Sequence, residues 1–149
     1  MFRDGVGKLL VFRLGAERFA VDLASVDEVV DAPVTQRLPD APPNVLGLAS
    51  IRGELVRVYD PRPILHVGGA LDGVVLLFAR DDRRRIALAI DDVFDAITVE
   101  EAEVQAAPGT DASDGVLVGV IRRNGALIAV LDVDALLDVA TTVTDGEKA

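Results

Sequence analysis

Apolar and polar residues follow a pattern that occurs twice along the chain. The two copies span residues 47–65 and 119–137, and each has two strand-like runs on either side of a tight turn. The turns contain Gly53 and Gly125, and glycine takes a positive φ without a Cβ clash, as a hairpin apex requires. Further positions match in register: Gly47 with Gly119, Leu55 with Leu127, Val58 with Val130, Asp60 with Asp132, and Leu65 with Leu137. The pattern predicts a duplicated hairpin unit.

Shorter apolar runs predict the remaining strands, and helical signals are few. We expect strands at residues 8–14, 19–23, 74–80 and 85–90, and a turn at 25–30 leading into a short strand that ends near residue 32. Residues 91–97 repeat the feature at 25–30. Asp60 is placed to cap a short helix at residues 61–66, with Pro61 in its first turn. Other helical segments are expected at 44–46, in part of 100–107 and at 133–139, followed by a polar tail at 141–149.

This spacing of strands and turns predicts a mostly β protein that forms one domain over residues 1–149. We expect two five-stranded barrels related by a pseudo-twofold axis, with short helices, one at about residues 8–66 and the other at about 74–139. The glycine-rich segment 67–73 is the expected boundary between them. Alternation and the repeat place these side chains in the barrel interiors: Val11, Val21, Leu55, Val58, Leu76, Leu88, Leu127 and Val130.

Composition excludes several classes of partner and site. The formal net charge is −10, so no basic surface of the usual kind is available, and we expect no binding to nucleic acid or to anionic membranes. The absence of cysteine excludes disulfides and zinc–thiolate sites. No apolar run approaches a membrane span, and the N-terminus lacks a signal-peptide pattern. We therefore expect a soluble cytoplasmic protein.

The sequence offers little catalytic chemistry. His66 is the only histidine and has no evident nucleophile or orienting partner nearby in the sequence. Ser50 is not in a nucleophile elbow, and phosphate-binding glycine motifs are absent. The acidic loop at residues 111–114 lacks the spacing of a calcium loop. We therefore expect no catalytic residue, no cofactor and no metal, and we interpret the chain as a binding module.

Arginine supplies the most informative polar positions. Arg52 sits at a predicted hairpin apex, where its guanidinium could engage a carboxylate or carbonyl of a partner. The sequence is equally consistent with an ordinary turn arginine that contacts only solvent. The basic run Arg83, Arg84 and Arg85 leaves a similar choice between a charged loop and a contact for an acidic partner.

Residues 47–60, G-L-A-S-I-R-G-E-L-V-R-V-Y-D, resemble the signature of the CheW-like chemotaxis coupling proteins, roughly G-x-x-N-L-R-G-x-x-x-P-V-x-D-L. The stretch L-V-F-R-L-G-A-E-R-F-A-V-D-L-A-S-V-D-E-V is also similar to the first strands of that family, and the resemblance covers about residues 8–139. It implies two five-stranded SH3-like barrels. The departures bear on partner identity more than on fold: Ser50 for Asn, Ile51 for Leu, Arg57 for Pro, and Pro61 for Leu.

The resemblance also implies a function. CheW-like proteins couple the cytoplasmic tip of a methyl-accepting chemoreceptor to the regulatory domain of the CheA-type histidine kinase. A non-enzymatic adaptor is therefore expected, one that reaches membrane arrays only through its partners. The implied receptor-binding residues are Arg52, Val26, Glu28, Ala87 and Val93. The implied kinase-binding residues are Gly47, Gly53, Leu55 and Val56.

Two other functions stay open at this point. One is a divergent CheW-like scaffold of a motility or other signalling array without ordinary kinase coupling. The other is an enzyme with an unrecognised acidic cleft, which thermal shifts with nucleotides and metals would distinguish from an adaptor.

Overall fold

The structure is a computed structural model of the 149-residue chain. It describes residues 2, 4–31, 35–42, 44–67, 74–79, 85–106 and 115–146. The expectations for the segment 68–73, for Arg83 and Arg84, and for the acidic loop at 111–114 lie outside the described residues. So does the burial of Leu76, since the description of strand 74–79 covers its backbone only.

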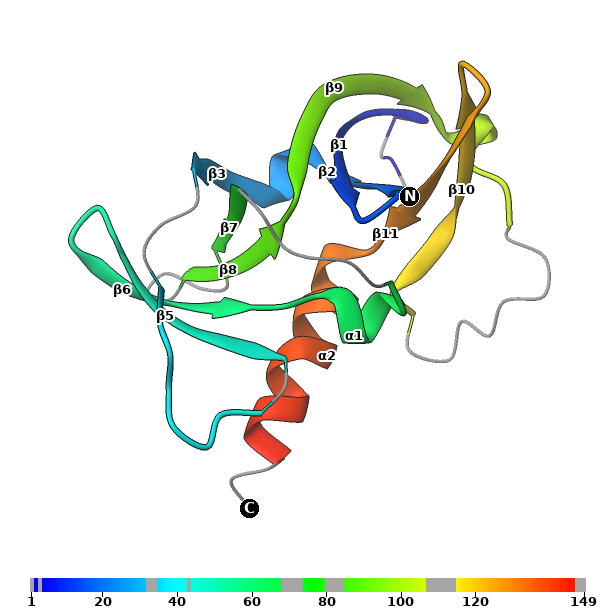
Figure 1. Cartoon of the computed structure of the whole chain (residues 1–149). Coiled ribbons are helices and arrows are strands. Elements are labelled where there is room, and N and C mark those ends of the chain that lie inside the picture. The colour runs from blue at the N-terminus through cyan, green and yellow to red at the C-terminus, as the bar shows by residue number, and fades with distance from the viewer. Residues whose placement is uncertain are drawn as a thin grey trace.

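The fold is mostly β and consists of two SH3-like barrels, which we call lobe one and lobe two (Figure 1). Lobe one is a six-stranded sheet. Its order is β3 (Val26–Asp31), β7 (Val74–Ala79), β8 (Arg85–Ile90), β6 (Glu54–Tyr59), β5 (Val45–Ile51) and β4 (Thr35–Gln36). Lobe two is a five-stranded sheet. Its order is β10 (Leu117–Arg123), β11 (Ala126–Leu131), β2 (Glu17–Asp22), β1 (Val6–Leu14) and β9 (Asp92–Glu100).

The expected division into residues 8–66 and 74–139 is wrong for the two sheets. The β1–β2 hairpin pairs with β9 and with β11, so it belongs to lobe two. The β7–β8 hairpin likewise pairs with β3 and with β6, so it belongs to lobe one. Each lobe therefore contains one hairpin from the opposite side of the predicted boundary: lobe two contains β1–β2, and lobe one contains β7–β8. The two-residue strand β4 adds the sixth strand to lobe one.

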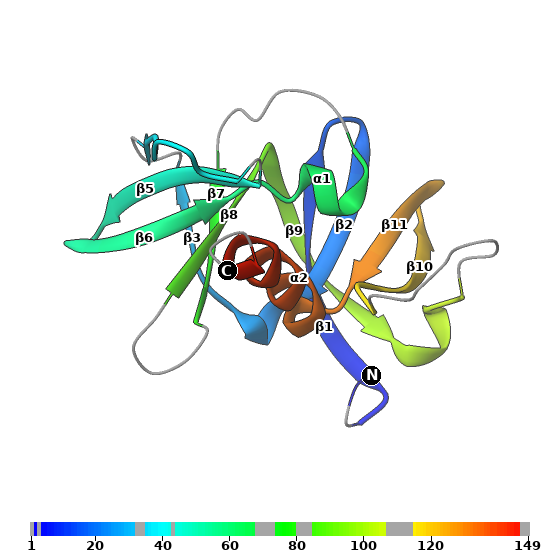
Figure 2. The same ribbon diagram turned by 90° about the horizontal axis from the view of Figure 1, so that it is seen from below.

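Three apolar clusters hold this arrangement together. Lobe one encloses a small core that includes Val56, Val58 and Ala87, and lobe two encloses one that includes Leu9, Val11 and Val130. A larger central core lies where both lobes meet the C-terminal helix α2 (Val133–Gly146). Its members are Leu10, Phe12, Leu14, Phe19, Val21, Val45, Tyr59, Ile86, Leu88, Ile90, Val116, Leu131, Val133, Leu136, Leu137 and Ala140. Figure 2 shows α2 between the two lobes.

The central core explains the continuous apolar runs of β1 and β8. In β1, Leu9 and Val11 face the core of lobe two, whereas Leu10 and Phe12 face the central core. Strand β8 divides its residues between the core of lobe one and the central core in the same way. A strand that is covered on both faces needs apolar residues at consecutive positions.

The predicted interior is confirmed at Val11, Val21, Val58, Leu88 and Val130, all of which are buried. It is wrong at Leu55 and Leu127, which are 72% and 60% exposed. Successive side chains of a strand point to opposite faces. Leu55 is three residues from Val58, and Leu127 is three residues from Val130, so each leucine points away from the core that its valine enters.

The duplication predicted from the sequence is confirmed in the two hairpins. Arg52 and Gly53 form the turn between β5 and β6 with φ of 52° and 79°, and Asn124 and Gly125 form its counterpart with φ of 51° and 79°. Positive φ at both central residues is the signature of the type I′ turn, whose twist suits an antiparallel hairpin. The two hairpins therefore share a backbone conformation as well as a sequence pattern.

Gly47 and Gly119 match for a second structural reason. In both hairpins the register shifts at the glycine, between Val45 and Gly47 and between Leu117 and Gly119. A Cβ at Gly47 would overlap the carbonyl oxygen of Gln36, and a Cβ at Gly119 would overlap that of Gln105. A neighbouring segment thus crosses each bulged strand so closely that only glycine fits.

The helices differ in part from the expectation. Helix α1 (Arg62–Leu65) follows Pro61, and the Asp60 carboxylate accepts a hydrogen bond from the Arg62 backbone N–H, as predicted. Short 3-10 turns occur at Leu23–Ser25 and Glu101–Glu103. The helical turn expected at 44–46 is instead the start of β5, because Val45 pairs with Tyr59. Helix α2 extends to Gly146, since no glycine or proline interrupts residues 133–145.

In the described part of the chain, no helix has both the length and the hydropathy needed to cross a membrane.

Candidate functional site

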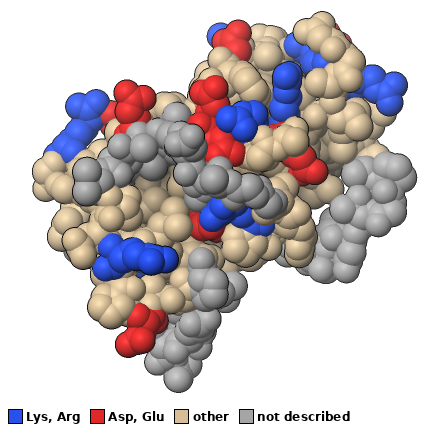
Figure 3. All heavy atoms as spheres, in the orientation of Figure 1, with Lys and Arg blue, Asp and Glu red and all other residues tan. Residues whose placement is uncertain are grey.

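A cluster of five charged side chains lies at one end of lobe one, and we call it the charged rim. Its members are Asp27 and Glu28 on β3, Arg52 in the β5–β6 turn, Glu54 at the start of β6, and Arg85 at the start of β8. On the face shown in Figure 3, the described acidic and basic side chains are interspersed rather than gathered by sign. The rim is therefore distinguished by its contacts and not by an excess of one charge.

Arg52 and Glu28 form the most direct contact of the rim. Arg52 Nε donates to Glu28 Oε2 at 2.6 Å, and Arg52 Nη2 forms an ion pair with the same oxygen. The Arg52 side chain is 71% exposed, so the guanidinium remains accessible while it is paired. The sequence alternatives for Arg52 were a partner contact or a solvated turn residue, and the structure shows an exposed arginine that is paired with Glu28.

This ion pair joins segments that are far apart in the sheet of lobe one. Strand β3 is one edge of that sheet, and the β5–β6 hairpin lies toward the opposite edge. A contact between Glu28 and Arg52 therefore requires the sheet to curl until its two sides meet, as in a barrel. The ion pair spans the seam where the barrel closes.

Arg85 is the second arginine of the rim. Its Nη1 donates to Asp27 Oδ2 at 3.0 Å and lies 3.6 Å from Glu28 Oε1, while its Nε and Nη2 are each 3.3 Å from Glu54 Oε2. One guanidinium therefore contacts three carboxylates on two other strands.

The contacts of the rim shift the acidity of its members. The hydrogen bond from Arg52 holds the pKa of Glu28 below its ordinary value of 4.5, and the charge of Arg85 adds to the effect. The hydrogen bond with Glu28 raises the pKa of Arg52, and the hydrogen bond with Asp27 raises that of Arg85. Both arginines and Glu28 are therefore fully charged at neutral pH.

An NMR titration of the Glu28 carboxyl group is expected to give a midpoint below 4.5. Because its folded-state pKa is depressed, Glu28 contributes stability above its unfolded-state pKa, and the contribution is lost as pH falls through the lower folded value. Arg52→Ala removes the main cause and should return the midpoint toward 4.5. A wild-type midpoint at or above 4.5 would contradict the pairing.

The remaining receptor candidates are placed differently from one another. Val26 and Val93 are half-buried, and both pack against the central core, so the two repeat-equivalent positions do approach the same apolar region. Ala87 is completely buried in the core of lobe one. Its side chain cannot contact a partner, because alternate residues of β8 face that core.

The kinase candidates also divide into exposed and buried positions. Leu55 and Gly53 are exposed at the β5–β6 hairpin. Val56 is buried in the core of lobe one, and Gly47 is buried beneath the carbonyl of Gln36. Val56 and Gly47 therefore support the hairpin, and the contact surface of this set is reduced to Leu55 and the turn.

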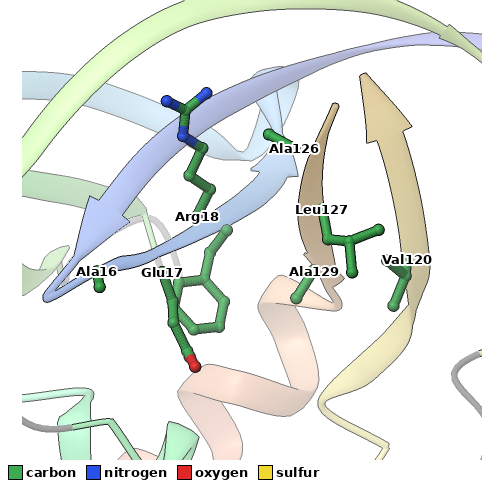
Figure 4. A pocket seen from close by; sticks show the side chains of 8 residues that line it. Ala16, Glu17, Arg18, Val120, Ala126, Leu127 and Ala129 are labelled. Atoms are coloured by element: carbon green, nitrogen blue, oxygen red, sulfur yellow. The ribbon is translucent and has the colours of Figure 1, made fainter. Parts of the chain in front are cut away.

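Lobe two carries an apolar hollow that the sequence analysis missed. It has a volume of about 450 Å³ and lies between the β1–β2 turn and the β10–β11 hairpin (Figure 4). Its lining residues are Ala16, Glu17, Arg18, Phe19, Val120, Ala126, Leu127 and Ala129. The period of two counted from Val130 would have placed Leu127 on this outer face.

A second hollow, of about 360 Å³, is lined in part by acidic side chains and bears on the acidic cleft considered above. Asp22, Asp132 and Asp134 line it together with Ser25. Asp22 Oδ1 accepts from the Ala24 N–H, and Asp132 Oδ1 accepts from the Ala135 N–H at the start of α2. Two of the three carboxylates thus satisfy backbone donors at helix starts, which is a structural task.

His66 is the exposed C-cap residue of α1, in a left-handed conformation with φ of 58°. Among the described residues, no group of three or more His, Asp or Glu side chains is arranged to hold a metal ion.

Comparison with known families decides the classification. The family model for the CheW-like domain matches residues 8–141, which is most of the chain. The chain belongs to the CheW-like domain family. Among relatives of this CheW-like chain, the chemotaxis protein CheW of Rhizobium meliloti is 28% identical over 137 residues, covering 89% of this chain and 88% of the relative. The CheW of Treponema pallidum is 27% identical over 139 residues, covering 87% and 81%.

A solved structure supports the same fold. The scaffolding protein TtCheW of Thermoanaerobacter tengcongensis superimposes with a TM-score of 0.71 and covers 84% of this chain and 88% of its own. The two sequences are 22% identical, so this likeness is evidence for the fold alone.

Proposed function

We propose that this CheW-like protein is a non-enzymatic cytoplasmic adaptor that couples chemoreceptor cytoplasmic tips to the regulatory domain of a CheA-type histidine kinase. The relatives described above are named as chemotaxis CheW proteins, and the structural neighbour is named as a scaffold. The observation that carries the proposal is the exposed Arg52, held by Glu28 at the tip of a hairpin that also exposes Leu55. Membrane arrays would be reached only through these partners.

The proposed receptor contact combines the charged rim with the half-buried Val26 and Val93. A helix of the receptor tip can place apolar side chains on such a surface and acceptor groups on its rim, which is the helix-in-groove mode. Charged groups at the rim fix register and discriminate between partners more than they add affinity. In this proposal Arg52 and Glu28 provide that discrimination.

The proposed kinase contact is centred on Leu55. An exposed leucine on a hairpin adds nothing to the core, but it can anchor an interface by entering an apolar pocket of the partner. Gly53→Asp is a poor probe of this contact because Gly53 has a φ of 79°, so the variant would strain the turn itself. Leu55 can be changed without straining the turn.

Leu55→Asp is expected to weaken binding to the kinase regulatory domain by about tenfold or more, because a charge would replace an apolar anchor. The measurement is a calorimetric titration of the kinase domain into wild type and variant. Leu127→Asp is the matched control, since it changes the equivalent exposed leucine of lobe two. Unchanged binding by Leu55→Asp, or a loss confined to Leu127→Asp, would place the kinase elsewhere.

The same titrations bear on the alternative of a scaffold without ordinary kinase coupling. Of the departures from the family signature, Ser50 is exposed beside the turn, Arg57 is half-buried, and Pro61 is buried at the start of α1. Ser50 is therefore the departure best placed to alter partner choice. A chain that binds receptor tips but no kinase domain would favour this alternative.

A further inference from the structure

Arg85 occupies the interior of the charged rim. It is the first residue of β8, and its side chain is 20% exposed, compared with 71% for Arg52. Its contacts reach β3 through Asp27 and Glu28 and reach β6 through Glu54. An arginine fork can hold several carboxylate oxygens in fixed directions, which a lysine ammonium cannot do.

Glu28 is shared between the two arginines. Its Oε2 accepts from Arg52 at 2.6 Å, and its Oε1 lies 3.6 Å from Arg85 Nη1. Because one oxygen of Glu28 lies near Arg52 and the other lies near Arg85, rotation of the Glu28 carboxylate is restricted. Arg85 also contacts the two neighbouring carboxylates, Asp27 and Glu54.

Arg52 engages Glu28 through Nε and Nη2, and within the described part of the chain its Nη1 has no recorded hydrogen bond or ion pair. One edge of the guanidinium is thus fixed, and the other edge is available. A guanidinium oriented in this way presents donors in a defined direction, which lowers the cost of ordering the side chain on binding.

We propose that Arg85 is a positioning residue for the partner contact of Arg52: by holding Glu28, Asp27 and Glu54, it fixes the direction in which Arg52 offers its free donors to acceptor groups of the receptor tip. The inference rests on the proposed function for the identity of the partner. Its structural part, the control of Arg52 by Arg85, does not depend on any partner.

The structural part is tested by ¹⁵N NMR of the Arg52 Nε–H group in the free protein. Arg85→Ala is expected to speed exchange of this proton with solvent by at least about tenfold, because Glu28 is no longer held as its acceptor. Arg85→Lys keeps the charge but not the fork, so it should give an intermediate rate. Arg123→Ala is the matched control, since Arg123 pairs with Glu103 in lobe two and its side chain is 33% exposed, compared with 20% for Arg85. Unchanged Arg52 exchange in Arg85→Ala overturns the proposal.

The functional part is tested by titrating a chemoreceptor cytoplasmic-tip fragment into wild type, Arg85→Ala, Arg52→Ala and the double variant. Arg85→Ala is expected to weaken binding about fivefold to tenfold in the wild-type background and to have no further effect in the Arg52→Ala background. An equal loss in both backgrounds shows that Arg85 acts independently of Arg52 and overturns the proposal. If Arg52→Ala binds the fragment as wild type does, the proposed receptor contact fails, and the NMR experiment alone decides the role of Arg85.

Discussion

Leu136→Ala is expected to lower the free energy of unfolding by about 2–5 kcal/mol, the usual range for a buried leucine. Leu136 is completely buried on α2, in the central core where both lobes meet the helix. The central core contains residues from strands of both sheets, so it cannot collapse around the cavity without moving one lobe relative to the other. Chemical denaturation of wild type and variant measures the difference.

Leu127→Ala is the control for this experiment. The side chain is 60% exposed on lobe two, so its removal should change the free energy of unfolding by about 0.5 kcal/mol or less. The expectation from the sequence placed Leu127 in the barrel interior, where its removal would carry the larger cost. Equal destabilisation by the two variants would contradict the strand register described here.

The repeated hairpin was the part of the fold most open to prediction. Turn glycines, the bulge glycines Gly47 and Gly119, and the capping Asp60 all act through local backbone geometry. Such requirements restrict the residue types within a few positions of the turn or cap, so they can be recognised in the sequence. The strands that flank the two turns could therefore be predicted, and the structure confirms them.

The assignment of hairpins to lobes could not be predicted in this way. β1 pairs with β9, whose residues lie far along the chain, and neither strand carries a pattern that names its partner. The two-faced burial of β1 and β8 also removes the alternation that would mark an inner and an outer face. Sequence adjacency therefore suggested a division that the sheets do not follow.

The candidate site shows the same limit. The resemblance to the family selected Arg52 and Glu28, and the closure of the sheet explains why residues of β3 and of the β5–β6 turn come together. It also selected Ala87 and Val56, which the strand register buries. Arg85 was not selected, because a run of three arginines is typical of a charged loop, and only its contacts distinguish it.

Arg52→Ala is expected to weaken binding of a receptor-tip fragment about thirtyfold, the effect of losing an interface anchor. The fold should be little affected, because an exposed ion pair contributes little to stability, and the melting temperature should change by no more than about 2 °C. Calorimetric titration with parallel melting curves measures both quantities. Unchanged affinity, or affinity lost only because the variant unfolds, would contradict a role for Arg52 in binding.

The adaptor function is tested most directly by asking whether the chain bridges its two proposed partners. A chemoreceptor-tip fragment is immobilised, and capture of a kinase regulatory domain is measured with and without this protein. The proposal predicts that capture requires the wild-type chain and is lost with Arg52→Ala and with Leu55→Asp, although each variant retains the other partner. Kinase capture that does not depend on the chain, or binding of the two partners that is mutually exclusive, would contradict the adaptor function.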